Sequence, residues 1–254
     1  VIDNLKEKKI DIINCDIKDY KKLKNLLLDC KYVFNFAGIA DINESNEDPI
    51  NTITNNIVGS SNIFDICSKL KVKRIFFAST LYVNSNSGGF YKSTKQCLEN
   101  ILETYSKNKK LKFTILRYGS LYGKNSQKWN GIYKYINQAI NTNKIICNGD
   151  GEEIREYIHV DDAAKLSIKT MDKKYVNQYV TISGINSLKA KDLFVMIGEI
   201  LNKKLKIIYK KNISGEHYKT TPYNFNPKRS LKIVPNEFID LGEGLLEIIE
   251  KDFK

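Results

Sequence analysis

Residues 76–95 decide the fold: Phe76-Phe77-Ala78-Ser79-Thr80 is followed, after a short loop, by Tyr91-Lys92-Ser93-Thr94-Lys95. The residues before Ser79 form a continuous apolar run, which is typical of a strand buried on both faces of a parallel sheet. The residues after Tyr91 predict a helix, because apolar side chains recur there at helical spacing. A buried strand that leads into an amphipathic helix indicates an α/β fold.

The same alternation extends in both directions from this stretch. Asp19, Asp48 and Ser187 are expected to cap helices, the second of which runs to about Leu70. Further helices are expected around 132–140 and after Val160. The other strands are expected at 10–13, 32–37, 113–116, 179–182 and 205–209.

Alternating strands and helices with short connections predict a parallel sheet covered on both faces. Beyond Arg117 the pattern loosens, and we expect a smaller lobe beside the sheet. The expected division places 1–118 in the sheet domain, with 152–182 returning to it, and places 119–151 and 183–254 in the lobe. The chain has 254 residues, enough for a substantial core.

Composition excludes several classes of protein. No apolar run is long enough to span a bilayer, and the five cysteines are too dispersed for a zinc site or a disulfide framework. The net charge of +12 comes from scattered lysines without interleaved aromatic residues, so nucleic-acid binding is not expected. Neither a metal site nor a signal peptide is visible, and a reducing cytoplasm is the expected location.

Ligands of open parallel sheets bind outside the carboxyl ends of the strands. The predicted strand ends are Asp16, Ala37-Gly38, Ser79-Thr80 and Arg117-Tyr118. Tyr91 and Lys95 are four residues apart and share one face of their helix. We therefore expect Thr80, Tyr91 and Lys95 to meet in one crevice.

This trio suits proton transfer to and from an alcohol. A free phenol has a pKa of roughly 10, and a nearby ammonium is expected to lower the pKa of Tyr91. Thr80 would hold the reacting oxygen. The same Tyr-x-x-x-Lys spacing occurs at Tyr20 and Tyr105, so an ordinary surface pair is the alternative interpretation.

With these strand ends the chain resembles the extended short-chain dehydrogenase/reductase superfamily, in its NAD-dependent epimerase/dehydratase branch that acts on nucleotide sugars. The resemblance covers nearly the whole chain and implies a Rossmann-like doubly wound sheet with a C-terminal substrate lobe. It rests on six segments in order: Cys15-Asp16-Ile17, 34–38, 56–62, the Thr80/Tyr91/Lys95 trio, Leu116-Arg117-Tyr118 and 155–162.

The resemblance also assigns roles to individual residues. Thr80, Tyr91 and Lys95 match the catalytic residues, and Thr80, Ser120 and Arg155 match positions that contact the substrate, Arg155 at its phosphate. The positions implied for NAD contact are Asp16, Ile17, Phe36, Ala37, Gly38, Asn56, Tyr91, Lys95 and Tyr118.

Simpler roles remain open for four of these residues. Asp16 alone suits the approach to a helix, Asn56 a buried structural amide, Arg155 a surface ion pair, and Gly38 close packing.

The sequence departs from the family pattern in three places. The glycine-rich fingerprint that receives the pyrophosphate does not precede Ile10. We therefore expect the chain to lack its first βαβ unit, and to bind NAD poorly and show no turnover in that form. The loop from Thr80 to Tyr91 is short for the family, and Ser120 stands where sugar epimerases often carry Asn.

The resemblance implies a nucleotide-sugar 4-epimerase that works through a 4-keto intermediate and uses NAD, with NADP not excluded. The alternatives are a reductase or dehydrogenase with the same trio, and a non-catalytic NAD-binding relative. A homodimer is the expected assembly of the full-length protein.

Overall fold

The computed structural model describes residues 10–210 and 217–222. Its main sheet has four strands, all parallel, in the order β1-β2-β3-β7. The strands are β1 (Tyr32–Asn35), β2 (Arg74–Thr80), β3 (Phe113–Tyr118) and β7 (Gln178–Ile182). This arrangement confirms the predicted α/β fold with a parallel sheet.

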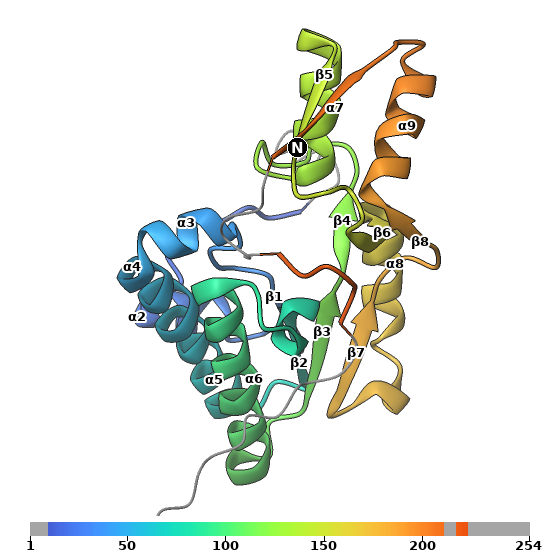
Figure 1. Ribbon diagram of the computed structural model, residues 1–254. Coiled ribbons are helices and arrows are strands. Elements are labelled where there is room, and N and C mark those ends of the chain that lie inside the picture. Colours follow the sequence, from blue (N-terminus) through green and yellow to red (C-terminus); the bar gives the residue numbers. More distant parts are fainter. Residues whose placement is uncertain (1–9, 211–216, 223–254) are drawn as a thin grey trace, which may run out of the picture.

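Helices cover both faces of this sheet (Figure 1). One face packs on α2 (Tyr20–Leu26), α5 (Gly59–Lys69) and α6 (Gly89–Lys109), and the other on α8 (Val160–Lys169). All seven residues of β2 are buried, as the apolar run of the sequence predicts. β2 is therefore the centre of the core.

The long helix predicted after Asp48 consists of three pieces. Asp48 caps α4 (Pro49–Ile53), a π-helical turn follows in η1 (Thr54–Val58), and α5 continues the run. The Asp48 side chain accepts a hydrogen bond from the Asn51 N–H at 3.1 Å, as expected for an N-cap. Just before this run lies the short helix α3 (Ile42–Glu47).

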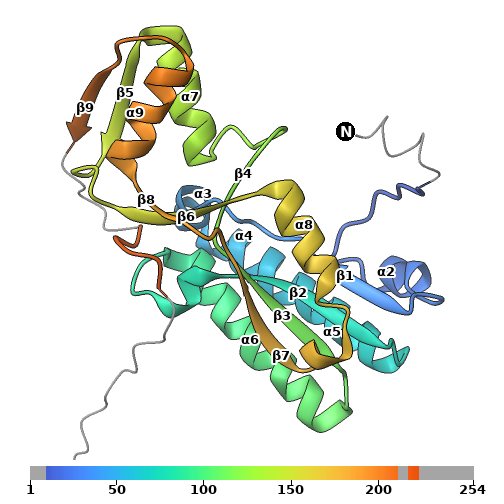
Figure 2. The same cartoon turned by 90° about the vertical axis from the view of Figure 1, so that its right-hand side faces the viewer.

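A second part of the molecule stands beside the sheet (Figure 2). It is built from α7 (Gly131–Thr142), β5 (Lys144–Asn148), α9 (Ala190–Ile200) and β9 (Lys206–Lys210), and β5 pairs with β9 in parallel. Ala139, Ile145 and Phe194 lie in its own buried cluster. The expected domain boundaries after residues 118 and 182 stay a proposal. The pairing of β7 with β3 supports the return of the chain to the main sheet before residue 182.

A small three-stranded sheet connects the two parts. It contains β4 (Ser120–Tyr122), β6 (Ile154–His159) and β8 (Ser187–Lys189), in the order β4-β6-β8. The remaining described elements are two short 3₁₀ helices, η2 (Leu81–Asn84) and η3 (Lys173–Tyr175).

Two sequence predictions are wrong. Residues 10–13 form no strand, and Ile10, Ile12 and Ile13 are exposed, because no described strand lies beside them to form a ladder. Ser187 does not cap a helix: it pairs in β8 with Glu156, and α9 begins three residues later. Tertiary pairing overrides the local capping preference there.

No helix within 10–210 and 217–222 combines the length and the apolar character that crossing a membrane requires.

Arg74 connects the start of β2 to the end of α8. Its side chain is only 4% exposed and donates to the carbonyls of Thr170, Met171 and Asp172. These carbonyls follow the last turn of α8, where a helix leaves acceptors unsatisfied. A positive charge there also suits the helix dipole.

We expect Arg74→Met to lower the free energy of unfolding by about 2–4 kcal/mol, because buried carbonyls lose charged donors. Urea unfolding followed by circular dichroism measures the change. Lys73→Met is the matched control, since Lys73 is exposed and adjacent. Equal effects of the two substitutions would contradict the role given to Arg74.

Candidate active site

Tyr91 lies in the first turn of α6, two residues after a pair of glycines with left-handed backbone. Gly88 has φ +105° and Gly89 φ +50°, conformations that side-chain-bearing residues rarely adopt. The Tyr91 N–H donates to Ser45 Oγ at 3.2 Å, and its phenol shares a hydrogen bond with the Thr80 hydroxyl. The structure therefore brings Thr80 and Tyr91 together as predicted.

The pKa of Tyr91 does not follow the sequence prediction. Burial raises it to about 12, and the hydrogen bond with Thr80 offsets only part of that shift. Burial disfavours the charged phenolate, and in this structure it outweighs the neighbouring groups that favour it. The prediction that Lys95 lowers the pKa of Tyr91 is therefore wrong for the protein without a bound ligand.

Lys95 is buried at the end of β2. Its Nζ donates to the Ala78 carbonyl at 2.8 Å and lies 4.8 Å from the centre of the Phe77 ring. Burial lowers the pKa of Lys95 to about 8, while the Glu99 carboxylate acts in the opposite direction.

Glu99 is itself held in a buried network. Its carboxylate accepts from Ser79 Oγ at 2.6 Å and from Arg117 Nη2 at 2.6 Å. Glu99 lies one turn after Lys95 on α6, and that spacing was the available sequence signal for it. The network ties the carboxyl ends of β2 and β3 to α6.

Gly38 lies across the crevice from Lys95. It has φ +140°, and a Cβ built on it would lie 3.9 Å from Lys95 Nζ and 2.7 Å from Asn56 Oδ1. Only glycine fits this turn between β1 and α3. The backbone of Gly38 therefore lies close to Lys95 with no side chain between them.

Asn56 holds this turn in place. Its Oδ1 accepts from the Ile39 N–H at 2.7 Å, and its Nδ2 donates to Ile39 O at 3.0 Å and Thr94 Oγ1 at 3.1 Å. Both amide hydrogens are thus used within the protein. The structure gives Asn56 the role of a buried structural amide, and direct contact with a cofactor stays a prediction.

Asp16 and Ile17 form a turn that packs on the start of α5. The Asp16 side chain is exposed and accepts from the Lys18 N–H at 2.8 Å, and Asn62 Nδ2 donates to Ile17 O at 3.2 Å. A Cβ on Gly59 would lie 2.4 Å from Ile17 Cδ1, so glycine permits this contact. The exposed carboxylate remains accessible to a ligand.

Phe36, Ala37 and Tyr118 lie where β1 and β3 end. Phe36 is 57% exposed, and its ring centre is 6.1 Å from that of Tyr118. The Tyr118 hydroxyl is bonded to Ser167 Oγ of α8 at 2.5 Å, and the Ala37 N–H donates to Asn35 Oδ1 at 3.1 Å. The Tyr118 hydroxyl and the Ala37 N–H are thus already engaged within the protein, which leaves the aromatic rings of Phe36 and Tyr118 for contact with a ligand.

Arg155 reaches the site from β6. Its Nη1 is buried and has no hydrogen-bond partner among the described residues, and its guanidinium carbon lies 4.6 Å from the Tyr218 ring centre. The simpler alternative of a surface ion pair is therefore wrong within the described chain. Ser120 pairs with Tyr157 on the same small sheet, two residues from Arg155.

Sequence reasoning missed three residues around Tyr91. Tyr82 follows Thr80 by two positions, and its ring lies 6.4 Å from that of Tyr91. His217 and Tyr218 both contact Tyr82, from a segment more than 130 residues away in the sequence. No local pattern links residues so distant, and only the fold brings them together.

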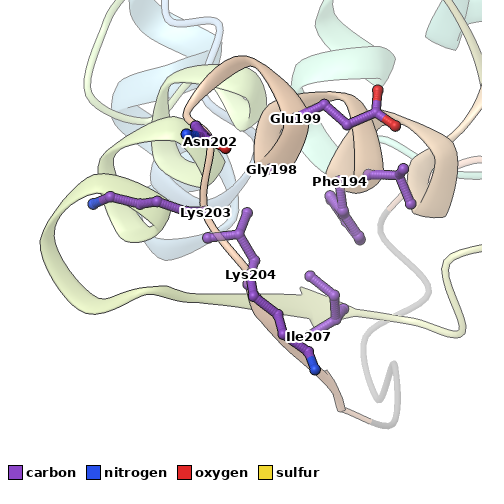
Figure 3. Close-up of a pocket in the computed structure, with 9 residues that line it drawn as sticks. Phe194, Gly198, Glu199, Asn202, Lys203, Lys204 and Ile207 are labelled. Carbon is purple, nitrogen blue, oxygen red and sulfur yellow. The ribbon is translucent and has the colours of Figure 1, made fainter.

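A hollow of about 400 Å³ lies elsewhere, between α9 and β9 (Figure 3). Its lining combines Phe194 and Ile207 with the exposed charged residues Glu199, Lys203 and Lys204. It holds none of the predicted site residues and no buried acid–base pair. We therefore place the candidate active site at the strand ends.

A parallel sheet with a phenol, a hydroxyl and a buried ammonium at its carboxyl edge defines the class of short-chain dehydrogenase/reductase folds. The model of the NAD-dependent epimerase/dehydratase family matches residues 1–182. The chain belongs to this family.

Several relatives are nucleotide-sugar enzymes. A putative UDP-glucose 4-epimerase of Methanocaldococcus jannaschii is 26% identical over 260 residues, covering 95% of this chain and 83% of the relative. The dTDP-D-glucose 4,6-dehydratase of Dictyostelium discoideum is also 26% identical, over 62% of this chain and 42% of its own length. Sequence identity alone therefore does not separate epimerases from dehydratases.

Solved structures give the same picture. The UDP-N-acetylglucosamine 4-epimerase from Methanobrevibacter ruminantium, in complex with UDP-N-acetylmuramic acid, aligns with a TM-score of 0.75 and 26% identity, over 85% of this chain and 74% of that one. The UDP-glucuronic acid 4-epimerase from Bacillus cereus, in complex with UDP-glucuronic acid and NAD, aligns with a TM-score of 0.79 and 23% identity, over 90% and 81%.

We expect Glu99→Gln to lower the pKa of Lys95 below its value of about 8, because the substitution removes the carboxylate that raises it. Titration of the Lys95 side chain by ¹³C NMR, with isotope-labelled lysine, measures the shift. A Lys95 titration unchanged by Glu99→Gln would contradict the coupling.

Glu103→Gln is the control for that titration. Glu103 lies one turn further along α6 and is bonded to Tyr179 rather than to the Lys95 region. The control is expected to leave the titration of Lys95 in place.

Proposed function

We propose that the protein is a nucleotide-sugar 4-epimerase that uses NAD and works through a 4-keto intermediate. The observation that carries the proposal is the buried hydrogen bond between Thr80 and Tyr91, with the Lys95 ammonium at the end of the same strand. Family membership and the 4-epimerase relatives support it.

The crevice fits a nicotinamide group. Gly38 presents backbone without a side chain opposite Lys95, and Phe36 adds an exposed ring beside it. Lys95 would hold the nicotinamide ribose, and Asp16 with Ile17 would contact the adenine end. NAD, when bound, accepts a hydride from the sugar carbon and returns it.

Tyr91 would move the proton. It would take the proton of the sugar hydroxyl as a hydride leaves the same carbon, and return it after the ketone has presented its other face. Thr80 would hold the reacting oxygen by hydrogen bond. The charge of Lys95 would favour the phenolate, which burial alone disfavours.

Arg155 would bind a phosphate of the nucleotide. Its Nη1 is buried and has no hydrogen-bond partner among the residues that the structure describes, an arrangement that is costly unless an anion meets it. Ser120 lies on the neighbouring strand and would contact the sugar side of the same ligand. A homodimer remains part of this proposal as a prediction.

Epimerisation is preferred over dehydration because of the residues after Thr80. In dehydratases of this superfamily an Asp and a Glu follow the catalytic Thr, since elimination of water needs an additional acid and base. Here Leu81 and Tyr82 occupy those positions and offer no carboxylate. A reductase or dehydrogenase with the same trio is the remaining enzymatic alternative.

In the full-length protein, Tyr91→Phe is expected to reduce turnover by at least ~100-fold, the usual scale for a lost general acid–base group. Interconversion of UDP-glucose and UDP-galactose, and of their N-acetylated and uronic acid forms, measures it. Tyr105→Phe is the matched control, because Tyr105 has a lysine at the same spacing and lies away from the crevice. Turnover within a few-fold of the parent would remove Tyr91 from the mechanism.

The second prediction concerns the product. We expect no 4-keto-6-deoxy sugar when the full-length protein is incubated with dTDP-glucose or UDP-glucose and NAD, because neither Leu81 nor Tyr82 supplies a carboxylate. Mass spectrometry detects the loss of water directly. Accumulation of that product would replace the epimerase assignment by a dehydratase.

A further inference from the structure

Residues 217–222 lie between the small connecting sheet and the η2 turn that follows β2, and they contact both (Figure 1). On the side of the small sheet, the Ile154 N–H donates to Lys219 O at 2.7 Å, and Ile154 forms a parallel bridge with Thr220. On the side of the main sheet, Asn84 Nδ2 donates to Pro222 O at 3.4 Å. We call residues 217–222 the bridging segment.

Tyr82 is the main contact of this segment with the main sheet. Its hydroxyl is bonded to His217 Nδ1 at 2.6 Å, and its ring centre lies 4.6 Å from that of Tyr218. The Tyr82 ring also lies edge-on to that of Tyr91, with centres 6.4 Å apart. Tyr82 therefore contacts both the Tyr91 ring and the bridging segment.

The ring contacts continue to Arg155. Its guanidinium lies over the Tyr218 ring at 4.6 Å, so Tyr91, Tyr82, Tyr218 and Arg155 form one connected series. In the proposed reaction, the two ends of this series bind the sugar hydroxyl and the phosphate. A hexose joined to a diphosphate must span the distance between them, beside Tyr82 and Tyr218.

Tyr82 has hydrogen-bonding capacity left for a ligand. A phenol offers one donor and two acceptor positions, and His217 uses one of them. Burial raises the pKa of Tyr82, so the phenol is neutral at ordinary pH. A neutral phenol suits a sugar hydroxyl, and an aromatic ring suits the apolar face of a pyranose.

We propose that Tyr82 is a substrate-contacting, specificity-determining residue that binds the hexose of the nucleotide sugar, and that His217 is its positioning residue. This inference rests on the proposed function and deepens it by assigning the sugar subsite.

A purely structural role predicts different behaviour. If Tyr82 and His217 only fasten the bridging segment, their loss disturbs the sugar and phosphate subsites together. If Tyr82 contacts the sugar, removing its hydroxyl weakens the binding of a nucleotide sugar and spares that of the bare nucleotide. UDP and UDP-sugars therefore separate the two roles.

The test is calorimetric titration of the full-length protein loaded with NAD. UDP is compared with UDP-glucose, UDP-N-acetylglucosamine and UDP-glucuronic acid. Tyr82→Phe should raise the dissociation constant of the tightest-binding UDP-sugar about tenfold, the scale of one lost hydrogen bond. The dissociation constant of UDP should stay within a factor of two of that of the parent. The melting temperature should stay within a few degrees of that of the parent.

His217→Ala supplies the second measurement. We expect it to weaken the binding of the same UDP-sugar by a similar factor. The double variant should lose no more affinity than either single variant, because both substitutions break the same Tyr82–His217 hydrogen bond. Tyr105→Phe is the control and should change neither ligand.

Three results would overturn the proposal. Equal weakening of UDP and the UDP-sugar by Tyr82→Phe would assign Tyr82 a structural role, and no change in either would remove it from the site. A parent that binds none of the three UDP-sugars would overturn the proposed function as well. A parent that binds and epimerises a UDP-sugar, with Tyr82→Phe indistinguishable from it, would overturn this inference alone.

Discussion

The burial of one cation, Lys95, sets the requirements that the rest of the site meets. A charge removed from water is costly unless protein groups replace its hydration. The Ala78 carbonyl and the Phe77 ring supply part of this replacement, and Glu99 supplies the opposite charge. Glu99 is buried in turn and needs donors of its own.

Those donors come from Ser79 and Arg117, and the Arg117 guanidinium lies 4.4 Å over the ring of Tyr179 in β7. One buried ammonium is thus connected to polar residues at the carboxyl ends of β2 and β3, and through Arg117 to a tyrosine of β7. Folding and chemistry share these contacts. A change that replaced this polar chain by apolar residues would also remove the groups that hold the Lys95 charge in the core.

Much of the fold was predictable from local pattern. The buried run before Ser79, the helix after Gly89 and the Asp19 and Asp48 caps follow from periodicity and capping chemistry, and the structure has all of them. The strand expected at 10–13 failed because a strand exists only with a partner, and periodicity carries no information about partners. Ser187 failed for a related reason, since its pairing with Glu156 is a long-range contact.

The site was predictable in its identities and not in its energetics. Thr80 and Tyr91 come together as the strand ends suggested, and Lys95 donates to Ala78, two residues before Thr80. The pKa of Tyr91 is nevertheless raised, because sequence spacing does not reveal the depth of burial. The contacts of Tyr82 with His217 and Tyr218 depend on how the two parts of the molecule sit together. No residue pattern of this chain encodes that arrangement locally.

The π-helical turn at Thr54–Val58 has a consequence for how the gene can vary. Such a turn contains one residue more than the α-helical turn it replaces, and it lies where Asn56 reaches the backbone of Ile39. Deletion of a single residue would turn this segment into a regular α-helical turn and remove the bulge from which the Asn56 amide reaches that backbone. Exposed positions such as Ile50 and Val58 are free to change identity, whereas the number of residues between Asp48 and Gly59 is fixed. In this segment length, rather than composition, is under constraint.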